Sequence, residues 1–244
     1  MRKLFLSLPL VIATSVSAEN SFLQAGIGLV NVSNPYLGSK SESLVFPFIS
    51  YKNGNFAIEG AEISYQIADS GDFALRSHIK PGFDFLDASK SSDQQIQKLA
   101  DRKISVLAGF TLSAQQTFGV ISLSVNGDVS GTSKGMVIEG GISKPFPLTE
   151  KLTFVPSLSV VAMNSQYSDY YFGLEKDFGS LHQYSTGSST RLNATSTFLY
   201  KHSAKLNFLA SISMSRMSDA IASSPIVESP NSHAVIVGVQ YAFN

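Results

Sequence analysis

The side chains that could carry metal or nucleophilic chemistry are few and widely spaced. The chain has no cysteine and four histidines, which are His78, His182, His202 and His233. None of them has the His-x-x-x-His or Glu-x-x-His spacing that places two metal ligands on one helix face. The lack of cysteine excludes thiol catalysis and Cys-ligated zinc. We therefore expect no metal site and no cofactor.

The sequence also lacks the motifs that accompany catalysis by an activated serine. The sequence contains no Gly-x-Ser-x-Gly turn and no glycine-rich phosphate loop. Most serines instead alternate with apolar residues, as small polar residues do on β-strands. We expect that the protein is not an enzyme. The alternative is a lipase-like or acyltransferase-like site within a barrel, for which the spacing defines no triad.

In several segments apolar and polar residues alternate, and the charged residues lie on the polar face. The segment 73–85 shows this best, because its aromatic and aliphatic residues share one face and its charged residues share the other. If the apolar face meets lipid, a one-residue slip would cost roughly 2–4 kcal/mol for each Arg or Lys that it turned outward. The charges form either a selective pore lining or a mutually paired barrel interior. The lumen-lining candidates are Glu62, Arg76, His78, Lys80, Asp84, Glu139 and Arg191.

The same alternation recurs in about twelve segments, and their length indicates membrane strands. Most run to 11–13 residues, whereas soluble strands have about five or six and tilted membrane strands need about 9–11. The sequence therefore predicts an all-β fold, an antiparallel transmembrane β-barrel of about 12 strands (10–12). A secreted lipocalin-like barrel is the alternative, but its core would have to be filled by the polar parity. The segments lie near 21–31, 42–52, 55–67, 72–86, 103–114, 117–127, 134–146, 151–164, 167–174, 189–201, 204–216 and 232–243.

The N-terminus and the composition favour a secreted envelope protein. Arg2 and Lys3 precede an apolar run, and Val16-Ser17-Ala18 offers a small-residue cleavage site, which predicts a signal peptide over 1–18 and a barrel over 19–244. Charged residues are 15% of the chain, against about a quarter in typical soluble domains. The formal net charge is zero and there is no basic stripe, so we expect no nucleic-acid partner.

Longer polar stretches at 32–41, 87–102, 175–188 and 217–231 read as loops. Within 87–102, the residues 92–95 could cap a short helix that carries Ile96, Leu99 and Ala100. With both termini in the periplasm, the twelve-segment map places 87–102 on the periplasmic side, where turns are normally short. Either a strand is miscounted or that segment is a periplasmic or lumenal element.

The last strand has the Gly-x-x-aromatic-x-aromatic spacing of outer-membrane barrels in Gly238 to Phe243, although Asn244 follows the final aromatic residue. Several short motifs precede it along the chain: Asn34-Pro35-Tyr36-Leu37-Gly38-Ser39, Phe46 to Phe56, Leu99-Ala100-Asp101-Arg102, Tyr170-Tyr171-Phe172-Gly173-Leu174 and Ser223-Ser224-Pro225-Ile226-Val227. In this order the motifs resemble the MltA-interacting protein (MipA/OmpV) family. The region of about 115–150 has no clear counterpart in that family.

The resemblance implies an outer-membrane barrel in contact with lipid, in a Gram-negative envelope. It also implies a scaffold that links a murein lytic transglycosylase to a bifunctional penicillin-binding protein. A narrow passive pore for small solutes and an adhesin are the alternatives. Ser224, Pro225 and Ile226 would then be a partner or ligand contact, or simply part of a loop that folds back into the barrel mouth.

Overall fold

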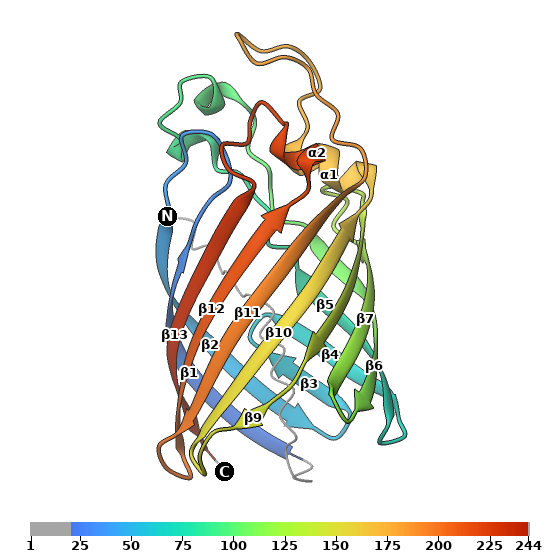
Figure 1. Cartoon of the computed structure of the whole chain (residues 1–244), viewed down its shortest axis with the longest axis vertical. Coiled ribbons are helices and arrows are strands. Elements are labelled where there is room, and N and C mark those ends of the chain that lie inside the picture. The colour runs from blue at the N-terminus through green and yellow to red at the C-terminus, as the bar shows by residue number, and fades with distance from the viewer. Residues whose placement is uncertain (1–20, 244) are drawn as a thin grey trace.

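The computed structural model describes residues 21–243, and within them one closed antiparallel sheet forms a barrel (Figure 1). The sheet closes because β10 pairs with β11. Strands β8 and β9 both pair with β10 and form two parts of one wall strand, so the barrel has twelve. The predicted signal peptide, 1–18, and Asn244 lie outside the described residues. The strands are β1 Ser21–Val32, β2 Glu42–Asn53, β3 Phe56–Glu59, β4 Glu62–Asp69, β5 Phe73–Pro81, β6 Val106–Gln116, β7 Gly119–Asp128, β8 Met136–Ser143, β9 Phe146–Pro147, β10 Leu152–Met163, β11 Ser189–Lys201, β12 Leu206–Met217 and β13 Asn231–Ala242.

The two ends of the barrel differ in the length of their connections. We call one the turn end; it holds the start of β1, the end of β13 and the connections 54–55, 70–72, 117–118, 144–151 and 202–205. Gly54, with φ of 56°, makes the first of these turns, because an Asn-Gly pair accepts the positive φ that a tight hairpin turn needs. We call the other the loop end; it holds 33–41, 82–105, 129–135, 164–188 and 218–230.

The short helices of the described residues lie at the loop end. They are α1 Ser165–Phe172, α2 Asp219–Ala222 and two single 3₁₀ turns, Ala88–Lys90 and Ile96–Lys98. The Asn164 side chain caps α1 by accepting a hydrogen bond from the Tyr167 N–H. No helix within residues 21–243 is long and apolar enough to cross a membrane.

Two strand predictions are wrong, and their errors cancel in the strand count. Most of the segment 167–174 belongs to the helix α1, which begins after the N-cap residue Asn164. The prediction from alternation took no account of this capping signal. The segment 55–67 is two strands, since Gly60, with φ of 62°, allows a tight reversal that pairs Glu59 with Glu62. The extra strand moves 87–102 to the loop end, opposite the start of β1 and the end of β13, so the miscounted strand accounts for the predicted periplasmic placement, which is corrected. The helix expected there is reduced to the turn at Ile96–Lys98.

The barrel wall is apolar outside and polar inside. On the outward parity, Val45 is 67% and Met214 is 65% exposed. On the inward parity, small polar side chains such as Thr111, Thr197 and Ser211 are buried. This is the reverse of a soluble barrel and is typical of a barrel surrounded by lipid, which confirms the predicted fold class.

Proline is tolerated within β2 because one edge of this strand is free. Ile49 accepts a hydrogen bond from Gly60 N–H and therefore presents its backbone to β3. Pro47, two residues away, faces the same side, but β3 pairs with β2 only from Ser50 to Asn53. Pro47 has no N–H to donate, and within the described residues no strand pairs with this edge of β2 at Pro47. Proline in a sheet is normally found at such unpaired edges.

Close packing of phenylalanine rings over β1 glycines gives a testable stability effect. A Cβ on Gly26 would lie 2.5 Å from Phe48 Cζ and would also meet the Val239 carbonyl oxygen. We expect Gly26→Ala to lower the free energy of unfolding by about 1–2 kcal/mol through overpacking. Gly140→Ala, which meets open space, is the matched control and should not destabilise the barrel. Urea unfolding in lipid vesicles measures both, and equal effects would contradict the packing.

Candidate functional site: the plug and the charged interior

The loop end contains a buried cluster of side chains that we call the plug. It packs residues from the loops against inward-facing residues at the ends of β6, β8, β10 and β12. Tyr171, Phe172, Ile221 and Ile226 are completely buried in it. The plug consists of Tyr36, Leu86, Ala88, Ile96, Leu107, Val137, Val161, Met163, Tyr167, Tyr171, Phe172, Leu174, Leu181, Met217, Ile221 and Ile226.

Motifs that carry the family resemblance meet in the plug. Tyr36 Oη donates a hydrogen bond to the Tyr171 carbonyl at 3.0 Å, and its ring stacks on Phe172. Ser224 Oγ donates to the Phe172 carbonyl at 2.6 Å. Arg102 Nη2 donates to the Gly173 carbonyl at 3.2 Å. Segments far apart in the sequence are thus joined by side chains that satisfy the backbone around α1.

The tyrosines of the plug act as protonated hydrogen-bond donors. Burial, aided by the negative charge of Asp84, raises the pKa of Tyr36 and Tyr167 well above the ordinary value. Burial also raises the pKa of Tyr171. Tyr171 Oη donates to the Lys103 carbonyl and accepts from Ser105 N–H, both at 2.9 Å. The three hydroxyls therefore keep their protons at neutral pH, and the Tyr171 hydroxyl holds α1 against 103–105.

An ion pair, which we call the clasp, lies where the plug meets the barrel interior. Arg191 Nη1 is 2.7 Å from Asp84 Oδ1, and Tyr167 Oη donates to Asp84 Oδ2 at 3.1 Å. The Asp84 side chain is 8% exposed. The clasp joins β11, the segment that follows β5, and α1.

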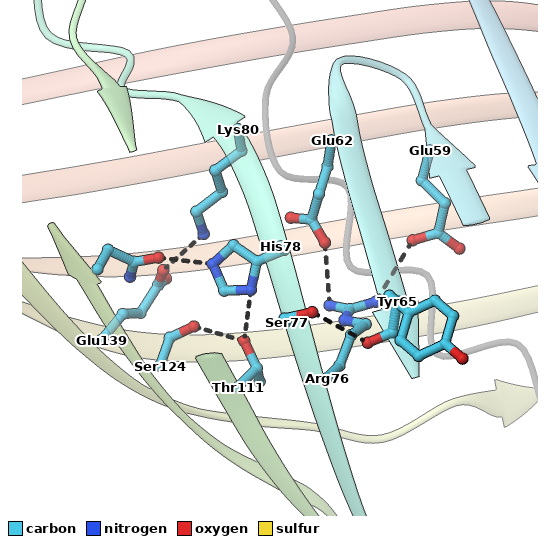
Figure 2. Close-up of polar contacts among 11 residues, drawn as sticks. Glu59, Glu62, Tyr65, Arg76, Ser77, His78, Lys80, Thr111, Ser124 and Glu139 are labelled. Carbon is cyan, nitrogen blue, oxygen red and sulfur yellow. Dashed lines mark hydrogen bonds and ion pairs between the residues drawn. The ribbon is translucent and has the colours of Figure 1, made fainter. Parts of the chain in front are cut away.

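A second cluster of charges lies on the inward parity of β3, β4, β5 and β8 (Figure 2). Arg76 pairs with Glu62 at 3.1 Å and with Glu59 at 3.8 Å. Lys80 Nζ lies 4.0 Å from Glu139 Oε2. Each charge in this cluster therefore has an opposite charge beside it.

His78 belongs to a hydrogen-bond network beside these ion pairs (Figure 2). Its Nε2 lies 2.6 Å from Asn126 Oδ1, which can only accept, so Nε2 carries a proton. Its Nδ1 lies 3.3 Å from the Thr111 hydroxyl, which in turn contacts Ser124. Within residues 21–243 no three His, Asp or Glu side chains gather closely enough to hold a metal ion.

The structure divides the predicted residues into three groups. Glu62, Arg76, His78, Lys80 and Glu139 lie together in the interior. Asp84 and Arg191 form the clasp. Asp84 is not a wall residue of the barrel, because β5 ends three residues before it, at Pro81. Ser224 and Ile226 are buried in the plug, and Pro225 between them is half-buried.

Sequence reasoning missed the partners of these groups. Glu59 stands next to the unrecognised Gly60 turn. Asn126 and Tyr167 are not marked by any charge pattern, although Asn164 is a helix-cap signal three residues before Tyr167. Tyr171 belongs to the motif at residues 170–174, but its spacing in the sequence does not predict the contacts that it makes.

Ser224 gives a direct test of how the plug is held. Ser224→Ala leaves the Phe172 carbonyl without its donor, so we expect about 1–2 kcal/mol of destabilisation and faster proteolysis of the loop end. Ser223→Ala changes an exposed neighbour and serves as the control. Limited proteolysis of the folded barrel compares them, and identical cleavage rates would contradict the assigned contact.

The fold and the site define a class of protein: a bacterial outer-membrane β-barrel with a plugged loop end. The family described as MltA-interacting protein MipA matches residues 25–243, and the chain belongs to this family. The protein is located in the outer membrane, and several of its relatives are named outer membrane proteins.

Two relatives and one solved structure illustrate the similarity. The chain is 28% identical to the MltA-interacting protein of Escherichia coli (strain K12), over 98% of each chain. It is 25% identical to the outer membrane protein YiaT of the same strain, over 93% of each chain. The COG4313 outer membrane channel from Pseudomonas putida F1 is 10% identical with a TM-score of 0.47, covering 93% of this chain and 97% of that chain.

Proposed function

We propose that this protein is a non-enzymatic scaffold that holds a murein lytic transglycosylase at the periplasmic end of the barrel, near a bifunctional penicillin-binding protein. The observation that carries the proposal is the plug, which fills the loop end with packed side chains. A loop end packed in this way is poorly suited to passing solutes, and the interior charges of the barrel are paired with one another. The name of one relative, MltA-interacting protein, supports a partner of this kind.

The turn end is the surface that would meet such a partner, because short turns normally face the periplasm. Four lysines, which we call the lysine rim, stand there on two neighbouring turns or at the end of the strand beside them: Lys144, Lys151, Lys201 and Lys205. Lys201 N–H donates to the Lys151 carbonyl, and Ala242 N–H donates to the Lys205 carbonyl, both at 2.8 Å. The rim therefore suits an acidic partner surface and would speed its association.

Affinity capture from envelope extracts tests the scaffold. The tagged full chain should recover a lytic transglycosylase, and the triple variant Lys151→Glu, Lys201→Glu, Lys205→Glu should recover about tenfold less, from roughly half a kcal/mol per reversed charge. The matched control reverses three exposed lysines of the loop end, Lys98, Lys103 and Lys176, and should keep the partner. Capture of other envelope proteins without a transglycosylase would contradict the proposal.

A narrow pore is the second candidate, favoured by the inward charges of β3 to β8. Planar-bilayer recording of the purified barrel separates the two. The scaffold proposal expects no steady conductance from the wild-type protein, whereas a pore requires one.

A further inference from the structure

The wall of the barrel is interrupted between β2 and β5, and this feature has no role in the function proposed above. The β3–β4 hairpin pairs with β2 only from Ser50 to Asn53, and it pairs with β5 only up to Ile79. Figure 2 shows the turn between Glu59 and Glu62 at which this hairpin ends. From there to the loop end, the described residues contain no strand between β2 and β5. We call this interruption the lateral gap.

Both edges of the lateral gap carry a proline. Pro47 faces the gap from β2, because it shares its side of the strand with Ile49. On the other edge, Gly82 N–H donates to the Ser105 carbonyl and therefore points toward the chain that leads into β6. Backbone groups of successive strand residues point to opposite sides, so those of Pro81 face the gap. Proline on an edge prevents another strand from adding to it, so this gap is suited to an occupant that is not a strand.

The lateral gap is also bounded at the loop end. The chain that follows β5 returns to the start of β2, where Lys90 Nζ lies 2.7 Å from Glu42 Oε2. Beside this pair, the Ser91 hydroxyl donates to the Leu37 carbonyl at 2.8 Å. The gap therefore extends along residues 43–48 of β2, about 20 Å of strand. In a bilayer, an unpaired edge is tolerated only where it borders protein or a water-filled cavity, and the polar interior of the barrel lies behind this one.

The inward face of β2 is apolar along the lateral gap. Leu44, Phe46 and Phe48 lie on this face, and all three are half-buried. The neighbouring strands continue the apolar surface, because Leu44 pairs with Val30 and Val30 pairs with Ile236. We call these five residues the apolar strip. None of them belongs to the plug, so the exposed part of the strip faces the interior of the barrel beside the gap.

A small polar pocket lies at the loop-end boundary of the lateral gap. It has a volume of about 150 Å³ and is lined by Asn34, Ser39, Lys40, Glu42 and Lys90. Lys90 is paired with Glu42, whereas Lys40 makes no ion pair with the described residues. Two ammonium groups thus face one carboxylate, and the excess positive charge suits a small anionic group. The volume lies below the range of pockets that hold a whole small molecule, so the pocket fits a head group alone.

We propose that the lateral gap admits a single-chain amphiphile with a carboxylate head, the chemistry of a long-chain fatty acid. The chain lies on the apolar strip and the carboxylate lies in the polar pocket beside Lys40. One strip along one strand accommodates one chain, and the small pocket excludes the large head of a lipopolysaccharide. Contacts with the strip replace contacts with other lipid chains, so the charged head contributes most of the preference. Entry is lateral, so the plug stays in place.

A single introduced tryptophan reports on the apolar strip, because the chain has none of its own. Phe46→Trp places the reporter on the strip, and Leu199→Trp places one on the inward face of β11, away from the gap. Each full-length barrel is reconstituted in vesicles of phosphatidylethanolamine and phosphatidylglycerol, and dibrominated stearic acid is added. Quenching at position 46 should saturate and should exceed quenching at position 199 several-fold. Leu44→Trp replaces Phe46→Trp if that variant does not fold.

Charge reversal at the polar pocket tests the head group. In the Phe46→Trp barrel, Lys40→Glu should raise the half-saturating amount of fatty acid about threefold, because it removes one exposed charge pair. Lys98→Glu changes an exposed lysine of the loop end that does not line the pocket. It is the matched control and should leave half-saturation unchanged. Fatty acid added to vesicles reaches both leaflets, so the test does not depend on the orientation of the barrel.

Three results would overturn the proposal. The first is equal quenching at positions 46 and 199, and the second is the same half-saturation in Lys40→Glu and Lys98→Glu. The third is stronger quenching at position 46 by acyl-brominated phosphatidylethanolamine than by the fatty acid at equal bromine content, which would assign the gap to a two-chain lipid. None of these measurements involves partner capture, so the proposal can fail while the scaffold stands.

Discussion

Replacing Asp84 by alanine is expected to lower the free energy of unfolding by about 3 kcal/mol, because it leaves a largely buried Arg191 guanidinium without its partner. The pair is short, at 2.7 Å, and Asp84 is 8% exposed. Tyr167 loses its acceptor in the same variant, so α1 loosens together with the clasp. Urea unfolding in lipid vesicles, followed by the shift between folded and unfolded electrophoretic bands, measures the loss.

A double variant separates the ion pair from simple packing. Asp84→Ala with Arg191→Met removes both charges, and we expect it to recover most of the stability that Asp84→Ala loses. Tyr167→Phe keeps the ion pair and should cost about 1 kcal/mol. Equal losses in the single and double variants would contradict the account of the clasp.

Placing a lysine on the outward face should be similarly costly. Ile212 lies on the outward parity of β12 and is 48% exposed, so Ile212→Lys should destabilise the barrel by about 3 kcal/mol in a bilayer. The same unfolding assay in vesicles measures this loss of stability.

The adjacent position serves as the control for this prediction. Ser213 lies on the inward parity, where its hydroxyl contacts Thr195. Ser213→Lys should cost about 1 kcal/mol, mainly through the lost hydrogen bond. If Ser213→Lys were the more damaging of the two, the assignment of the faces would be wrong.

The face of each long strand could be predicted from the sequence because alternation is a local property. Spacing alone predicts that His78 and Lys80 lie on one face of β5 and that Phe73 and Ile79 lie on the other. The structure shows the same two faces. The all-β barrel, its family and its outer-membrane location are confirmed by the structure and the relatives.

Features that depend on a single residue or on long-range contacts could not be predicted. At Gly60 the apolar parity shifts from Phe56 and Ile58 to Ile63 and Tyr65, but a one-residue shift also suits a bulge within one strand, so it does not by itself predict a turn. The partner of Arg191 is 107 residues away, and no local pattern selects Asp84 from the other acids. The convergence of Tyr36, Phe172 and Ser224 likewise requires the closed barrel, because their segments meet only across its loop end.

The orientation of the barrel is the claim on which the scaffold depends most directly. Because the chain has no cysteine, single-cysteine variants can be labelled in intact cells with a membrane-impermeant maleimide. Lys98→Cys lies at the loop end and Ala204→Cys lies at the turn end, and both positions are exposed. The account predicts that Lys98→Cys is labelled in intact cells and that Ala204→Cys is labelled only after the outer membrane is permeabilised. Labelling of Ala204→Cys but not Lys98→Cys in intact cells would place the lysine rim outside the cell and contradict it.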